Sequence, residues 1–272
     1  MLREIVDPNE ASWFKKHLNK IEENRRFWNG NFVSHCVPSI YPAYCKIFHP
    51  IYRDLSIDDC SLTWNDIEKQ KAPVPKDPVE KLISQSVIVY GGDHNPQSTE
   101  PIKWKQLADE NGLVFHPEFN VDSFTRNFPG YSWPRYLIGP EEGSLDFDTC
   151  KQIVRSIAIA SSDKDASQTC FFHYDLIATQ SFETDKLMEG QLIDVFKTVE
   201  VNDVNTTPTR WWPANRKWFI CSDWDLTFTL FGGDEEFVES LTSNKDLECI
   251  RVDPSTRVDY RSDRINPNPR DN

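Results

Sequence analysis

The stretch WWPANRKWFICSDWDLTFTLFGGDEEFVESLTSNKDLECIRVD, residues 211–253, decides the fold that the sequence predicts. Residues 213–215 (PAN) offer a turn between the tryptophan pair that opens the stretch and the apolar run 218–221. This arrangement predicts a β-hairpin. Residues 226–231 alternate threonine with apolar side chains, as a half-buried strand does. The first half of the stretch is therefore expected to contribute three strands.

The second half of the stretch predicts a helix and a further strand. The Gly232-Gly233 pair is expected to break the preceding strand. Asp234 can then cap a helix, because an aspartate at this position accepts hydrogen bonds from the first free amides. Apolar residues of this helix are Phe237, Val238 and Leu241. Residues 247–252 return as a strand.

Elsewhere the chain alternates short helices and strands irregularly. Two stretches open with an Asp-Pro pair that can start a helix, at residues 7–8 and 77–78. Further helices are predicted at residues 103–111 and after residue 144, and strands at residues 86–90 and 170–176. Residues 187–201 fit either a helix or a strand. Because hairpins are implied and no regular βαβ repeat is present, we expect an α+β fold with a mixed or mainly antiparallel sheet and short helices packed on it.

The sequence predicts a single α+β unit over residues 1–272, with two possible subdomains. Residues 1–70 form a helical, aromatic-rich part, and residues 78–252 contain the sheet. The segment KAPVPKD (71–77) is typical of a surface loop between them. Residues 253–272, rich in Pro, Asp, Arg and Asn, are expected to form an extended tail.

The formal net charge of −13 limits the partners that the protein can take. A strongly acidic chain lacks the basic stripe with which proteins displace counterions from nucleic acid, and it is not attracted to anionic membrane surfaces. A basic protein partner is favoured instead, because opposite fields steer encounter. No apolar run approaches the length of a membrane span, and the first residues carry no apolar core of a secretory signal. We therefore expect a cytoplasmic protein, and the sequence leaves its oligomeric state open.

The seven cysteines are scattered, with no Cys-Xaa-Xaa-Cys pair. In a chain without an export signal, they are predicted to be reduced and mostly buried. One region concentrates soft metal ligands: His35, Cys36, Cys45, His49 and Cys60. Zinc sites usually show tighter paired spacing. Core packing is therefore favoured over a zinc site here, and no resident metal or other cofactor is expected.

The segment WFICSDWDLTFT (218–229) resembles the first motif of haloacid-dehalogenase-type phosphatases. In that resemblance Asp223 is the nucleophile and Asp225 the acid/base, and both share a Mg²⁺ ion. The family opens its Rossmann-like domain with this motif and needs further motifs far downstream. Too few residues follow Asp225 to supply them. Mg²⁺-dependent phosphohydrolysis is therefore kept as an alternative, and the carboxylates are interpreted first as a solvated strand end.

A second enzyme resemblance is weaker. The segment FGGDEEF (231–237) is similar to the Gly-Gly-Asp-Glu-Phe signature of diguanylate cyclases, but it has one extra residue before Phe237. The long helix that the cyclases have before that signature is replaced here by a segment rich in Pro, Thr and Trp. An N-cap following a glycine pair explains the segment more simply.

Four tryptophans in this part of the chain predict a further alternative, a small-molecule site with an aromatic pocket: Trp211, Trp212, Trp218 and Trp224. Packing in the core and hairpin is the favoured interpretation of the same residues. We also single out Asp225, Gly232 and Gly233 as candidate binding residues.

Five segments taken in order carry a wider resemblance: PAYCKIFHP (42–50), KWKQLADENG (103–112), EEGSLD (141–146), WWPANRKW (211–218) and DLTFTLFGG (225–233). Together they resemble a family of uncharacterised bacterial proteins. Residues 71–100 look like an insertion relative to that pattern. The resemblance implies one co-folded unit and assigns no activity.

The leading functional hypothesis is therefore a non-enzymatic cytoplasmic binding protein. Its acidity would suit an immunity-type inhibitor of a basic toxin or nuclease.

Overall fold

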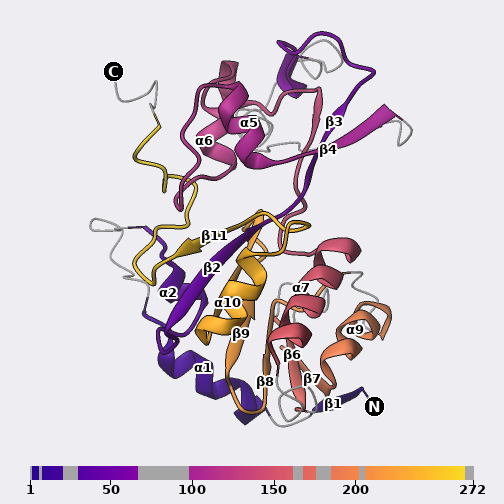
Figure 1. The fold of residues 1–272 in the computed structure, drawn as a ribbon, viewed down its shortest axis with the longest axis vertical. Coiled ribbons are helices and arrows are strands. Elements are labelled where there is room, and N and C mark those ends of the chain that lie inside the picture. The colour runs from indigo at the N-terminus through magenta and orange to yellow at the C-terminus, as the bar shows by residue number, and fades with distance from the viewer. Residues whose placement is uncertain are drawn as a thin grey trace, which may run out of the picture. The chain divides into compact units, whose positions relative to one another are not determined.

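The computed structural model describes residues 2–5, 8–20, 30–66, 98–161, 168–175, 185–201 and 206–266. The chain forms two compact units (Figure 1). Unit 1 consists of Met1–His49 and Glu141–Asp259, and unit 2 of Pro50–Pro140 and Tyr260–Asn272. These boundaries differ from the predicted division at residues 70 and 78, because the sheet of unit 1 uses strands from both ends of the chain.

Unit 1 is built on an eight-stranded sheet in which every neighbouring pair of strands is antiparallel. Across the sheet the strands are β1 (Arg3–Ile5), β7 (Lys186–Gly190), β6 (Cys170–Tyr174), β8 (Arg210–Pro213), β9 (Trp218–Cys221), β10 (Phe228–Gly233), β2 (Ala43–Phe48) and β11 (Cys249–Val252). The predicted α+β class is confirmed, and its sheet is antiparallel. The predicted hairpin is β8–β9, in which Trp211 pairs with Ile220.

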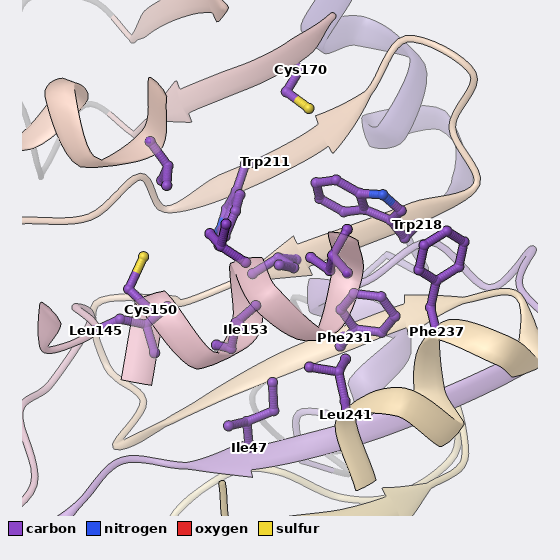
Figure 2. Close-up of a cluster of buried hydrophobic side chains, with 14 of the residues drawn as sticks. Ile47, Leu145, Cys150, Ile153, Cys170, Trp211, Trp218, Phe231, Phe237 and Leu241 are labelled. Atoms are coloured by element: carbon purple, nitrogen blue, oxygen red, sulfur yellow. The ribbon is translucent and has the colours of Figure 1, made fainter. Parts of the chain in front are cut away.

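One face of this sheet is covered by α7 (Phe147–Ala160), α9 (Val195–Val201) and α10 (Glu235–Thr242). A 3₁₀ turn, Leu192–Asp194, leads into α9. Figure 2 shows Ile153 of α7 and Leu241 of α10 pointing toward the strands, which contribute Trp211 of β8 and Phe231 of β10 to the same core. The helices present apolar residues at helical spacing, whereas the strands contribute every second residue. Trp211 and Trp218 belong to this core.

The other face of the sheet is covered by α1 (Ser12–His17), which follows the 3₁₀ turn Pro8–Ala11, and by α2 (Val33–Cys36). Trp13 and Phe14 of α1 pack edge-on against Trp212, with ring centroids 6.0 and 5.3 Å away. Trp212 stacks on Phe219 of the next strand at 5.7 Å. Adjacent residues such as Trp211 and Trp212 therefore serve two different cores, as the alternation of a strand requires.

Unit 2 contains a three-stranded antiparallel sheet in the order β4 (Thr99–Ile102), β3 (Ile51–Asp54), β5 (Leu137–Ile138). The helices α5 (Trp104–Glu110) and α6 (Val121–Thr125) and a 3₁₀ turn at Pro129–Tyr131 accompany it. The rings of Trp104 and Trp133 lie 6.1 Å apart, and both side chains are buried. Residues 260–266 pack into this unit.

The Gly232-Gly233 pair does not break its strand, contrary to expectation. Both glycines lie within β10 and pair with β2 and β9 on either side. A Cβ atom on Gly232 would lie 2.7 Å from Val37 Cγ1 and 2.9 Å from Tyr44 Cε1. The glycine therefore leaves room for Val37, at the C-terminal end of α2, and for the Tyr44 ring of β2 to pack against β10.

Other predicted boundaries also shift. The Asp-Pro pair at residues 7–8 is followed by a 3₁₀ turn and by α1, which ends at His17, and residues 21–29 lie outside the described residues. The strand predicted at residues 86–90 also lies outside them. Asp234 occupies the N-cap position of α10, but its side chain makes no capping hydrogen bond. Among the described helices, none has the length and apolarity to cross a membrane.

Candidate functional site

Polar side chains gather on one face of the sheet, at the end of the β6–β7 hairpin. Asp175 directly follows β6, and Asp185 directly precedes β7. Within the hairpin His173 pairs with Leu187, so two further steps along the same register bring Asp175 opposite Asp185. His173 and Asp175 are two residues apart and share a face. The register thus places all three side chains together.

The three side chains come within contact distance of one another. His173 Nε2 lies 3.2 Å from Asp185 Oδ2, and His173 Nδ1 lies 3.4 Å from Asp175 Oδ1. One ligand atom from each residue lies within 4.8 Å of the other two. Among the residues that the structure describes, no other group of His, Cys, Asp and Glu meets this geometry. We call these three residues the His173 cluster.

The imidazole of His173 is almost completely buried, with 1% of its side chain exposed. Burial lowers its pKa below the ordinary value of 6.5. Asp175 and Asp185 oppose this shift, whereas Arg210 and Lys15 add to it. A neutral imidazole carries one proton and therefore donates from one ring nitrogen only. Nδ1 makes no hydrogen bond to any described residue.

Arg210 connects the His173 cluster to the predicted nucleophile Asp223. Arg210, on β8, pairs with His173 of β6 on one side and with Cys221 of β9 on the other. Asp223 follows two residues after Cys221. Its Nη1 lies 2.6 Å from both oxygens of Asp175, and its Nη2 lies 3.5 Å from Asp223 Oδ2. The carboxylates at the ends of β6, β7 and β9 therefore form one continuous charged row.

Helix α1 contributes the last charge. Lys15 Nζ lies 3.5 Å from Asp185 Oδ2. With a neutral imidazole, the row contains two cationic side chains, Lys15 and Arg210, against three carboxylates, Asp175, Asp185 and Asp223. Among the described side chains of the row, the carboxylates therefore outnumber the cationic groups by one.

The two aspartates of the phosphatase hypothesis occupy different surroundings. Burial raises the pKa of Asp223, and Asp175 adds to this rise while Arg210 opposes it. Asp225 is exposed in the turn after β9, and its amide lies 3.4 Å from Asp223 Oδ1. That turn leads directly into the antiparallel strand β10. A Rossmann-like domain is built on a mostly parallel sheet, so the surroundings of the motif differ from those of the phosphatases it resembles.

Of the four tryptophans of the predicted aromatic pocket, Trp211 and Trp218 meet edge-on with ring centroids 5.8 Å apart, but Trp212 and Trp224 lie elsewhere. Trp211 and Trp218 pack under α7 and α10 (Figure 2), and Trp212 packs under α1 on the opposite face. Trp224 is 49% exposed in the turn after β9. Gly232 and Gly233 lie inside β10 and are covered by neighbouring side chains.

The ligands considered for zinc do not form a cluster among the described residues, which include all of residues 35–60. His49 is instead hydrogen-bonded within unit 1, and Cys45 is buried in the sheet. Cys170 and His173 lie on opposite faces of β6, as their spacing predicts. The seven cysteines are free thiols, and Cys221 and Cys170 lie in the cores, where they were expected.

Sequence reasoning missed the His173 cluster, although part of its signal is local. His173 and Asp175 stand two apart at the end of a predicted strand, a spacing that puts both on one face. Asp185 could not be found in this way, because its place depends on the register between two strands joined by a long connection.

Comparison with protein-family models, with curated proteins and with solved structures gave no match. The proposals below therefore rest on the geometry of this chain alone.

Proposed function

We propose that this chain binds a divalent metal ion through His173, Asp175 and Asp185. The observation that carries the proposal is that one ligand atom from each of these residues lies within 4.8 Å of the other two, beside an imidazole that is 1% exposed. If the imidazole is neutral, one ring nitrogen faces a carboxylate oxygen with no proton between them, whichever tautomer forms. A metal ion accepts lone pairs from both atoms and removes that repulsion.

The spacing of the ligand atoms supports a single ion. Protein ligands lie about 2.0–2.3 Å from Zn²⁺ and similar ions, so two ligands of one ion are at most about 4.5 Å apart. The separations of up to 4.8 Å in the His173 cluster need only a small inward movement. The oxygens of Asp175 keep lone pairs for an ion while they accept from Arg210.

The donor set favours a transition metal over Mg²⁺. One imidazole nitrogen and two carboxylates suit Zn²⁺ or Mn²⁺, whereas Mg²⁺ and Ca²⁺ prefer oxygen ligands alone. Three protein ligands leave coordination positions for water or a substrate. We expect Zn²⁺ and Mn²⁺ to bind more tightly than Mg²⁺.

Calorimetry on the chelator-stripped protein tests this proposal. Wild type should bind one equivalent of Zn²⁺ or Mn²⁺, and Asp185→Asn should weaken binding at least about a hundredfold, since even outer-shell changes cost about 10–100-fold. Asp223→Asn is the matched control, because it removes a carboxylate of the same charged row that is not one of the three ligands, and it should weaken binding much less than Asp185→Asn. Equal affinities of wild type and Asp185→Asn would overturn the proposal. So would an NMR titration in which His173 is doubly protonated at pH 7, because an imidazolium satisfies both carboxylates without a metal.

A second candidate function, metal-dependent hydrolysis of a phosphate ester, is favoured by one contact. Arg210 touches both Asp175 of the His173 cluster and the predicted nucleophile Asp223. A metal ion polarises a phosphoryl oxygen, and a guanidinium matches the geometry of phosphate. Hydrolysis of p-nitrophenyl phosphate with Mn²⁺ or Mg²⁺ tests it. Equal rates for wild type and Asp223→Asn would remove Asp223 from this role.

A further inference from the structure

Helix α1 lies directly over the His173 cluster. The Phe14 ring meets the His173 ring edge-on, with centroids 5.6 Å apart, and the Arg210 guanidinium lies 5.5 Å from the centroid of the same Phe14 ring. Phe14 is 1% exposed, so the helix is fixed here by packing. The next residue along the helix, Lys15, is consequently held beside the cluster.

Lys15 contacts the atom that the proposed metal site needs. Its Nζ lies 3.5 Å from Asp185 Oδ2, the oxygen that also lies 3.2 Å from His173 Nε2. The side chain of Lys15 is 58% exposed and that of Asp185 is 33% exposed. The ammonium therefore lies on the open side of the cluster, whereas His173 lies on the buried side.

From this geometry we infer that Lys15 is a built-in competitor for the metal ion, occupying the open side of Asp185 until the ion displaces it. The inference rests on the proposed metal site. A solvent-exposed ion pair between flexible side chains is weak, so the long lysine side chain can move away when a stronger cation arrives. A metal ion and an ammonium that remain within a few ångströms of each other repel. Lys15 thus sets how tightly the site holds its ion.

The test compares Lys15→Met with Lys16→Met by calorimetry with Mn²⁺ or Zn²⁺. Methionine keeps an unbranched apolar side chain while it removes the charge, and both lysines are exposed on the same helix. Lys15→Met should bind the ion about three- to tenfold more tightly than wild type, the effect expected from one exposed ion pair and the relief of like-charge repulsion. Lys16→Met should bind like wild type. The gain should shrink in 0.5 M salt, because exposed charges are then screened.

The outcomes separate this inference from the proposed site. If wild type binds the ion and Asp185→Asn does not, but Lys15→Met binds no more tightly than wild type, the metal site stands and the role of Lys15 is overturned. If Lys15→Met alone binds, the competition is stronger than expected and the inference holds. If neither wild type nor Lys15→Met binds the ion, the proposed metal site is wrong and the inference about Lys15 fails with it.

Discussion

At the end of β2, His49 is buried with both ring nitrogens in hydrogen bonds. Its Nδ1 lies 2.6 Å from the carbonyl oxygen of Glu141, and its Nε2 lies 2.9 Å from Thr229 Oγ1. One tautomer of the neutral ring satisfies both partners, with Nδ1 donating and Nε2 accepting. Burial lowers the pKa of His49 from 6.5 to about 4, against the opposing effects of the Glu141 carbonyl and Asp146. The fold therefore holds this histidine neutral.

This histidine predicts a pH-dependent stability. Between pH 6.5 and about 4 the unfolded chain binds a proton at His49 that the folded chain does not. Stability from this group is therefore complete above pH 6.5 and is lost as the pH falls toward 4, by up to about 1.4 kcal/mol per pH unit. Urea unfolding at several pH values measures the slope. His49→Gln should have a shallower slope than wild type in this window, and an unchanged slope would contradict the assignment.

Gly232 provides a second prediction at the residue scale. Its added methyl group would meet Val37, Tyr41 and Tyr44 at 2.7 to 2.9 Å. Overpacking a filled core costs about 1–3 kcal/mol, so Gly232→Ala should lower the free energy of unfolding by that amount. Val37→Ala removes the opposing methyl group, Cγ1, together with Cγ2. The double variant should therefore be more stable than the sum of the single changes predicts, and strict additivity would show that the contact with Val37 is not the cause.

Among the elements, those fixed by neighbouring residues were the most predictable. The β8–β9 hairpin and α10 follow from a turn signal and from helical spacing within about thirty residues. The His173 cluster depends on the β6–β7 register and on β8, which no local pattern specifies. For the same reason Arg210 drew no attention in the sequence, although it stands beside the tryptophan pair. The predicted strand break at Gly232 was wrong, because a glycine indicates either a turn or a place where neighbouring groups pack closely against the backbone.

The N-cap of helix α7 provides a prediction about how much one local interaction stabilises a helix. Asp146 is its N-cap, and the carboxylate accepts a hydrogen bond from the amide of Thr149 at 3.0 Å. Asp146→Ala should destabilise unit 1 by about 1 kcal/mol. Asp148→Ala, an exposed change in the first turn of the same helix, should cost less than about 0.5 kcal/mol. Urea unfolding followed by circular dichroism distinguishes them, and equal losses would mean that the cap is not the stabilising interaction.

At the scale of the whole molecule, residues 260–266 belong to unit 2, and the expected extended tail is therefore packed over this part. Asp263 Oδ1 lies 3.0 Å from His116 Nε2, and Asn266 exchanges hydrogen bonds with the backbone of Val114. Burial alone would raise the pKa of Asp263, but hydrogen bonds from His116, Ser123 and Asn266 hold it well below its usual range. Residues 260–266 therefore supply hydrogen-bond partners to buried polar groups of unit 2.

Ending the chain at Asp259 should therefore unfold unit 2 selectively. The truncation leaves His116, Asn120 and Arg126 without their partners in the tail, and each unsatisfied buried polar group costs about 1–3 kcal/mol. Hydrogen exchange should show lost protection in α5 and α6 and retained protection in β2 and β10. Loss of protection in both units would mean that the units do not unfold separately.

The net charge of −13 carries the remaining prediction, a basic protein partner. A complex steered by opposite charges weakens as salt screens the field. A pull-down at low salt should therefore recover proteins of high isoelectric point, and these should elute as the salt is raised. Recovery of acidic proteins alone, or binding insensitive to salt, would contradict this prediction.

The order of strands in unit 1 also sets when the protein can fold. Strand β2 lies between β10 and β11, so a strand from the first fifth of the chain has both neighbours in the last fifth. During synthesis β2 has no described strand to pair with until β10 has left the ribosome. Pairings between distant segments slow folding, because the loop between them must close first. The eight-stranded sheet of unit 1 can therefore be completed only late in synthesis, and a nascent chain truncated before β10 lacks both neighbours of β2.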